Sequence, residues 1–70
     1  MILSEWIYNL RNEKFSPVFL KGLEGELDGN ELDRIGRKFD IVVGEFLKGE
    51  IDGREAETRM NQILIDEDIR

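Results

Sequence analysis

The feature that most constrains the fold is a seven-residue motif that occurs twice. The sequence Gly-Glu-(Leu/Ile)-Asp-Gly-x-Glu spans residues 25–31 and again residues 49–55. Its first glycine can adopt the left-handed backbone conformation that closes a helix. Its aspartate can cap the following helix, and its last glutamate falls at the third helical position, which completes a capping box. The motif therefore predicts two turns that each stop one helix and start the next. The predicted capping residues are Asp28, Glu31, Asp52 and Glu55.

Apolar residues spaced by three or four predict helices on both sides of each motif. The clearest stripe runs over residues 32–46, and a shorter one follows over residues 56–64. Before the first motif, residues 2–14 form one more apolar stripe. The Ser16-Pro17 pair then predicts a break and a restart, because serine is a good N-cap and proline fits the first helical position. We therefore expect Ser16 to cap a short helix that ends near the first motif.

The predicted fold class is all-α, a small bundle of three to four helices with tight capped turns. A short β-pairing between residues 26–28 and 50–52 is a further possibility. Residues 1–65 are expected to form a single helical domain, and residues 66–70 an acidic C-terminal tail. A core this small is only marginally stable without disulfides or metals. We therefore expect the chain to form a homodimer.

The composition excludes several classes of chemistry. The 70 residues include neither cysteine nor histidine, so disulfides, Cys/His zinc sites and histidine-dependent nucleophilic catalysis are impossible. A calcium loop starting at Glu24 would have acids at its first, third and fifth positions, but Ile35 stands where a bidentate glutamate is needed. No glycine belongs to a phosphate-binding loop. The sequence therefore predicts no cofactor, no metal site and no enzymatic activity.

The charge pattern bears on the kind of partner. The chain has a net charge of −6, and residues 26–70 carry all of it. This surplus of acids disfavours direct binding to nucleic acid or to an anionic membrane surface. No apolar run reaches the length of a membrane span, and the first residues lack the basic segment of a signal peptide. A soluble, cytoplasmic protein is therefore expected.

The first predicted helix is apolar on more than one side. Trp6 and Tyr8 point in different directions, and Ile2 and Leu3 add further apolar surface. Either the helix is buried on two sides within the chain, or one side contacts a partner, where aromatic residues are enriched. The sequence leaves both interpretations open. The candidate partner-binding residues are Ile2, Leu3, Trp6 and Tyr8.

The second copy of the motif and the helix after it carry a family resemblance. This segment reads Leu47-Lys48-Gly49-Glu50-Ile51-Asp52-Gly53-Arg54-Glu55-Ala56-Glu57, followed by Arg59-Met60 and Ile63-Leu64. It resembles the SHOCT (short C-terminal) motif, a small helical hairpin with a Gly-x-Ile-(Thr/Asp)-x-x-Glu turn before a helix that ends in Leu-Leu. Ala56 departs from the pattern, since the family usually has an aromatic residue there. The resemblance covers residues 47–64 and implies an oligomerisation or protein-contact element.

Three functions are compatible with these patterns. The first is a small acidic regulatory or adaptor protein that acts through protein–protein contacts. The second is an inhibitor that mimics nucleic acid, with acids at 24–33, 50–57 and 66–68; the seven basic residues interspersed after residue 25 argue against it. The third is a metal-responsive helix–loop–helix module. We expect the first, with another copy of the chain or an unidentified protein as the partner.

Overall fold

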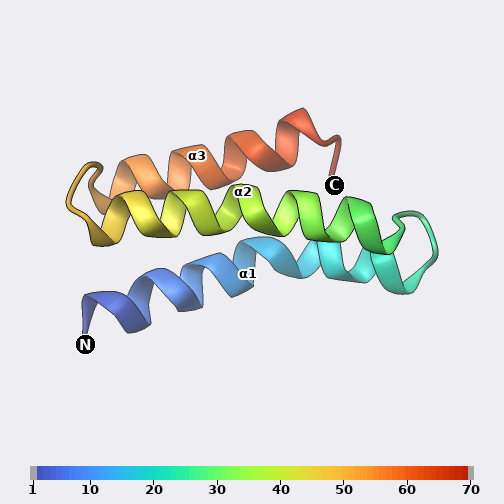
Figure 1. Ribbon diagram of the computed structural model, residues 1–70, viewed down its shortest axis with the longest axis horizontal. Helices are drawn as coiled ribbons and strands as arrows, with labels where there is room; N and C mark the ends of the chain where they lie inside the picture. The colour runs from blue at the N-terminus through green and yellow to red at the C-terminus, as the bar shows by residue number, and fades with distance from the viewer. Residues whose placement is uncertain (1, 70) are drawn as a thin grey trace.

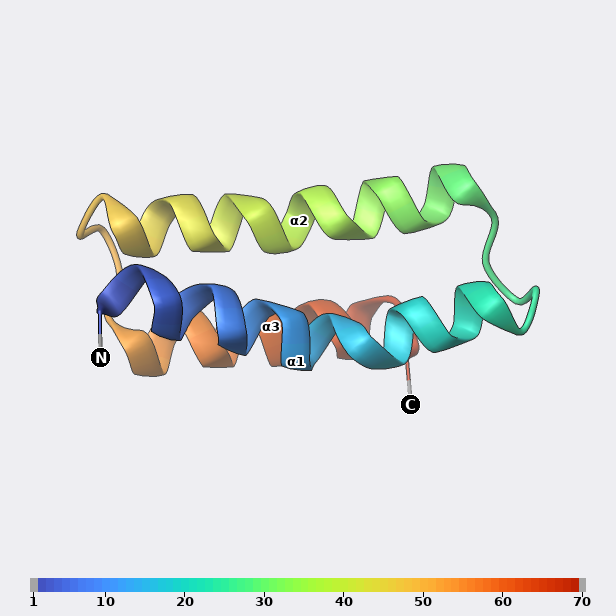
Figure 2. The same cartoon turned by 90° about the horizontal axis from the view of Figure 1, so that it is seen from below.

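The chain folds into three α-helices that pack together as a bundle. The structure is a computed structural model and describes residues 2–69. The helices are α1 (Leu3–Leu23), α2 (Gly29–Leu47) and α3 (Gly53–Asp66). Consecutive helices run in opposite directions (Figure 1), and Figure 2 shows α2 running alongside both α1 and α3, which also contact each other. The prediction of an all-α bundle of three to four helices is confirmed.

Both motifs start a helix as predicted, although only the first forms a complete capping box. At the start of α2, the Glu31 N–H donates to Asp28 Oδ1 at 2.8 Å and the Asp28 N–H donates to Glu31 Oε1 at 3.2 Å. At the start of α3, the Glu55 N–H donates to Asp52 Oδ1 at 2.8 Å. The prediction that the Glu55 carboxylate accepts a second bond from the Asp52 N–H is wrong. Arg59 lies one turn further on, and its Nε donates to that carboxylate at 3.1 Å.

The first glycine of each motif closes the preceding helix. Gly25 and Gly49 have φ angles of +81° and +79°, the left-handed conformation predicted for them. The Glu26 N–H donates to the Lys21 carbonyl at 2.9 Å, and the equivalent bond after α2 has the same length. These are the bonds of a Schellman motif. Each seven-residue motif is therefore a complete turn that ends one helix and caps the next.

The predicted break at Ser16 is wrong, because α1 runs without interruption from Leu3 to Leu23. Pro17 lies inside the helix, and Ser16 is exposed and does not cap a second one. The proline removes one backbone hydrogen bond, but the turns on either side of it pack on the core. Val18 is completely buried, and Phe15 packs edge to face on Phe39 with ring centroids 5.7 Å apart. Tertiary packing therefore carries the helix through a sequence that favours a break.

The predicted pairing of residues 26–28 with residues 50–52 is also wrong. The part of the chain that the structure describes contains no strand. The two segments lie at opposite ends of α2 (Figure 1), whose 19 residues hold them roughly 28 Å apart. Leu27 and Ile51 instead pack against the core at their own ends of the bundle.

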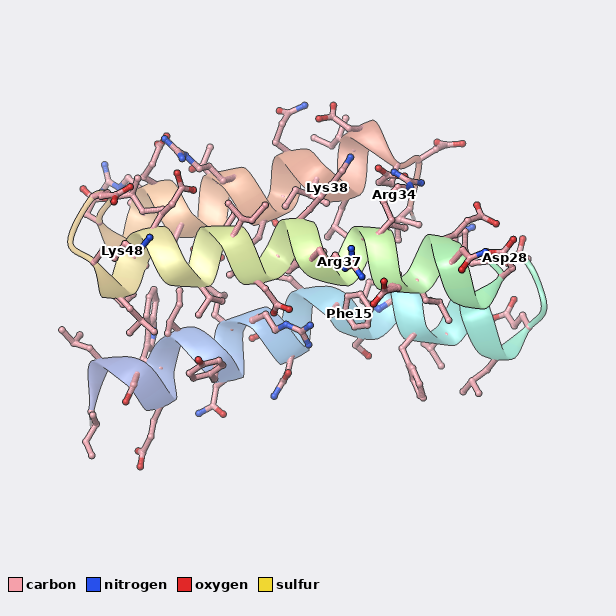
Figure 3. All side chains as sticks on the ribbon, in the orientation of Figure 1. Phe15, Asp28, Arg34, Arg37, Lys38 and Lys48 are labelled. Atoms are coloured by element: carbon pink, nitrogen blue, oxygen red, sulfur yellow. The ribbon has the colours of Figure 1, made fainter. Side chains whose placement is uncertain are left out.

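The core is entirely apolar. Phe15 lies between α1 and α2 (Figure 3) and borders this core together with Trp6, Leu32, Phe46 and other half-buried residues. No buried side-chain polar atom in residues 2–69 lacks a hydrogen-bond partner. Because the core has no polar network to fix its arrangement, the bundle depends on the fit of its apolar side chains. The buried core residues are Ile7, Leu10, Val18, Ile35, Phe39, Val42, Val43, Ala56, Met60 and Ile69.

The residues after α3 return to the bundle. The sequence predicts an acidic tail over residues 66–70, of which residue 70 lies outside the described part. Ile69 is buried, and its N–H donates to the Leu64 carbonyl at 2.8 Å. Asp68 has a φ of 56°, so it occupies the left-handed position that glycine fills after α1 and α2. The same turn geometry therefore closes all three helices.

Candidate protein-contact surface

Trp6 lies where α1 meets the other two helices. Its ring packs against that of Phe46, with centroids 5.5 Å apart, and lies over Gly53 at the start of α3. A Cβ atom on Gly53 would be 2.9 Å from Cη2 of Trp6, so glycine at this position makes room for the indole. The structure therefore places Trp6 half-buried within the bundle rather than on a free face.

The other three candidate partner-binding residues are at least half exposed and do not form one patch. Ile2 and Leu3 lie at the start of α1. Leu3 lines a shallow apolar groove of about 320 Å³ beside Trp6. Tyr8 lies five residues after Leu3, which places it about 140° around the helix. The structure thus brings Leu3 and Trp6 together and separates Tyr8 from them.

A further cluster of exposed apolar residues lies near the end of α1, on the side turned away from the bundle. Phe19, Leu20 and Leu23 are 54%, 52% and 70% exposed. Leu23 lies four residues after Phe19 and three after Leu20, so its side chain neighbours both of the others on the helix surface. Tyr8 lies three turns before Phe19 on nearly the same line. We call these four residues the outward face of α1.

Sequence reasoning missed this cluster, although the sequence holds a signal for it. Val18, Phe19 and Leu20 are consecutive apolar residues. Neighbours on a helix point about 100° apart, so one face cannot bury all three. Val18 is completely buried, and Phe19 and Leu20 are therefore directed toward solvent. Three adjacent apolar residues in one amphipathic helix thus predict apolar surface on its outer side.

Charge is distributed unevenly around α1. Its three basic residues all form ion pairs with acids: Arg11 with Asp40 (3.2 Å), Lys14 with Glu57 (3.4 Å) and Lys21 with Glu26 (3.9 Å). The three acids Glu5, Glu13 and Glu24 are exposed, and none has an ion pair within residues 2–69. Glu5 lies five full turns before Leu23, and Glu13 lies two turns before Leu20. The charged side chains of residues 3–24 that have no ion pair in the described part of the chain are therefore all acidic, and Glu5 and Glu13 lie on the same side of α1 as the outward face.

Another exposed apolar residue, Ile41 on α2, lies in different surroundings from the outward face. It borders a shallow groove of about 510 Å³ whose other lining residues include Arg37, Asp40, Glu45 and Lys48. Figure 3 shows Arg37 and Lys48 on this side of α2. Because the charges around Ile41 have both signs and no other large apolar side chain lines the groove, it is a weaker candidate for protein contact.

Glu67 ties the end of α3 to α2. Its carboxylate accepts hydrogen bonds from Arg34 at 2.7 and 2.9 Å and from Lys38 Nζ at 2.6 Å. Figure 3 shows Arg34 and Lys38 reaching toward this end of α3. The bonds from Arg34 and then Lys38 lower the pKa of Glu67 to about 2, and the same contact raises the pKa of Arg34. A carboxylate held in its ionised form in this way is structural rather than poised for proton transfer.

Most of the remaining acids are occupied within the chain or solvated. Asp28 and Asp52 cap helices, while Glu45 and Glu55 both bind Arg59. In residues 2–69, no three acidic side chains are grouped so that they could hold a metal ion. None of the helices in this part of the chain is long and apolar enough to cross a membrane.

No protein-family model matches the chain, and neither a curated protein nor a solved structure matches it. The resemblance of residues 47–64 to the SHOCT motif therefore stays a prediction. The functional interpretation accordingly depends on the chain's own surface, of which the outward face of α1 is the most distinctive part.

Proposed function

We propose that the protein is a small, non-enzymatic regulatory or adaptor protein that binds another protein through the outward face of α1. The observation that carries this proposal is the adjacent exposure of Phe19, Leu20 and Leu23. These side chains are not part of the core, which has its own apolar residues on all three helices. Folding alone therefore gives no reason for large apolar side chains at these positions.

Contiguous exposed apolar surface on a small protein is typical of a contact site. Single apolar residues are common on any surface, but here an aromatic and two leucines lie together on one helix. Aromatic side chains are enriched at the buried centres of protein interfaces. The homodimer expected from the short chain is one form of this proposal, in which a second copy covers the face.

The two other functions considered from the sequence receive less support. Nucleic-acid mimicry depends on free acids arranged along a surface, yet within residues 50–57 Asp52 caps a helix and Glu55 and Glu57 are ion-paired. Mimicry also leaves the apolar cluster on α1 unexplained. A metal-responsive module leaves the same cluster unexplained.

Site-specific photo-crosslinking in the source cell tests the proposal. Benzoylphenylalanine in place of Phe19 keeps an aromatic ring at the centre of the outward face. We expect this variant to form a covalent adduct with a protein after illumination. The matched control carries the same photo-reactive residue at Ile65, which is 69% exposed on α3. Equal labelling at both positions, or no adduct at position 19, would contradict a specific contact through α1.

A further inference from the structure

The partner's chemistry can be inferred from the charge on α1, on the basis of the function proposed above. We infer that the outward face of α1 binds a cationic amphipathic helix of another protein. Such a helix would lie along α1 with its apolar side on Phe19, Leu20 and Leu23. Its basic side chains would contact Glu13 and Glu24 near this cluster and Glu5 near the start of α1.

The charge of α1 favours a basic partner. Glu5, Glu13 and Glu24 are exposed and lack ion pairs within residues 2–69. The basic residues of α1 cannot neutralise them, because all three already pair with acids on other parts of the chain. A basic partner gains attraction along the whole face, whereas an acidic partner is repelled.

The shape of the outward face favours a helical partner. The outward face extends roughly 22 Å, or four helical turns, from Tyr8 to Leu23, with the exposed polar Asn12 and Ser16 between Tyr8 and the apolar cluster. The backbone groups within α1 are largely bonded inside the helix, so they offer little to an extended peptide that needs backbone partners. A helix satisfies its own backbone and presents a matching apolar stripe. About 15 to 18 residues of helix would cover the face.

A second copy of this chain suits the face poorly. In a symmetric dimer the same patch meets itself, so the three free acids of one α1 would approach those of the other. Each copy also brings a net charge of −6. Like charges brought together in this way oppose association at neutral pH and low salt. The same acids argue against an anionic lipid surface.

The test uses the whole chain and three synthetic peptides of about 18 residues. The first is an amphipathic helix of leucine and lysine, the second has the same composition in an order without an apolar stripe, and the third has glutamate in place of lysine. Binding is measured by isothermal titration calorimetry at low and high salt. We expect only the first peptide to bind, with affinity that falls as salt is raised.

Two matched variants locate the binding surface. Leu23→Ser and Ile65→Ser remove leucine-sized side chains that are 70% and 69% exposed, on α1 and α3 respectively. We expect Leu23→Ser to weaken binding of the basic peptide by about tenfold or more, and Ile65→Ser to leave it within about twofold. Glu13→Gln should weaken binding by a few-fold and reduce its salt dependence. Circular dichroism of each variant confirms that the helices are retained.

Several results would overturn the inference, and they separate it from the proposed function. Equal binding of the scrambled or the acidic peptide would show that a basic amphipathic helix is not what the face selects. If the chain binds no peptide but forms a dimer that Leu23→Ser dissociates, the face binds a second copy of the chain. The inference about a basic helix would then be wrong, while the proposed protein contact through α1 would still hold. Binding to phosphatidylcholine vesicles that Leu23→Ser abolishes would assign it to lipid. Peptide binding that both serine variants weaken equally would reject the outward face as the site.

Discussion

Two glycines at the same place in the repeated motif have different surroundings. Gly29 and Gly53 are each the first residue of a helix. A Cβ atom at Gly29 would meet nothing within 4 Å, whereas one at Gly53 would lie 2.9 and 3.2 Å from atoms of the Trp6 ring. The ring cannot easily move, because Phe46 packs against it. Packing against Trp6 thus accounts for glycine at position 53, whereas nothing in the structure requires a glycine at position 29.

This contrast gives a prediction with a built-in control. Gly53→Ala should destabilise the protein by about 1 to 2 kcal/mol, since the added methyl group overpacks the contact with Trp6. Gly29→Ala should change the free energy of unfolding by no more than about 0.5 kcal/mol, because its methyl group enters open space. Urea unfolding followed by circular dichroism measures both. Equal effects of the two substitutions would show that the indole does not require a glycine beneath it.

Sequence reasoning succeeds at the residue scale where the cause is local. The caps Asp28 and Asp52 bond within three residues of themselves, so their spacing alone predicts the bonds. The contact between Trp6 and Gly53 joins residues far apart in the chain, and no local pattern indicates it. The Glu55 carboxylate shows a third case, since a local capping bond and a local bond to Arg59 compete and the second is formed.

At the scale of elements, α1 shows packing overriding local preference. The Ser16-Pro17 pair is a good helix start, yet the helix continues through it because Phe15 packs on Phe39 of α2 and Val18 is buried in the core. An interior proline removes a backbone donor and crowds the preceding turn. The helix stays continuous despite this energetic cost, because a break at Pro17 would separate the two halves of α1 that pack on the core.

Replacing Pro17 should therefore make α1 more stable. Pro17→Ala restores a backbone N–H to the interior of the helix and should raise the free energy of unfolding by about 1 to 2 kcal/mol, with a gain in helical circular dichroism. Ser16→Ala is the control. Because α1 is continuous, we expect Ser16→Ala to change the free energy of unfolding by less than about 0.5 kcal/mol. A loss of about 1 kcal/mol would instead indicate that Ser16 caps a helix. A loss of stability in Pro17→Ala would mean that the bend or ring packing of proline holds the bundle together.

The outward face of α1 marks the limit of prediction at the element scale. Apolar spacing correctly predicts that α2 and α3 are amphipathic helices with one buried side. In α1, apolar residues lie around much of the helix, so spacing alone does not say which of them the neighbouring helices cover. Trp6 is half-buried and Phe19 is exposed because of how the three helices pack together. Only the assembled structure shows this packing.

At the scale of the whole molecule, the end of α3 is fixed to α2 by contacts between residues remote in sequence. Glu67 follows α3, while Arg34 and Lys38 lie on α2. The fold class follows from two turn motifs and three apolar stripes, all of which are local. The sequence does not predict this ion cluster, because Glu67 stands among other acids in a segment that looks like a solvated tail. The last residues are therefore part of the bundle for a reason that only tertiary structure supplies.

The stability of the bundle should depend on pH through Glu67. Its pKa is lowered to about 2 in the folded chain by Arg34 and Lys38. A carboxyl with a lowered folded-state pKa stabilises the fold above its ordinary pKa, and this contribution is lost as the pH falls toward the folded-state value. We expect Glu67→Gln to be less stable than the unaltered chain at pH 7, because it loses its ionic bonds to Arg34 and Lys38. The loss should be limited to about 1 to 2 kcal/mol, since both cations are partly exposed and screened by solvent.

Urea titrations between pH 7 and pH 2 test this expectation. The difference between Glu67→Gln and the unaltered chain should shrink as the pH falls from about 5 toward 2, since a protonated glutamate resembles glutamine. Glu57→Gln is the control, because its single contact with Lys14 is half-exposed and should contribute less than about 0.5 kcal/mol. A difference for Glu67→Gln that does not vary with pH would assign the effect to lost packing rather than to charge.

The position of Trp6 has a practical consequence for all of these experiments. It is the only tryptophan in the chain, and its ring touches the ends of α2 and α3 while it belongs to α1. Its fluorescence emission therefore reports whether the three helices are docked, whereas far-ultraviolet circular dichroism reports whether they are helical. Recorded together during one denaturation, the two signals would coincide for an all-or-none transition and diverge if helices persisted after they had separated. The chain thus carries an intrinsic optical probe of its own cooperativity.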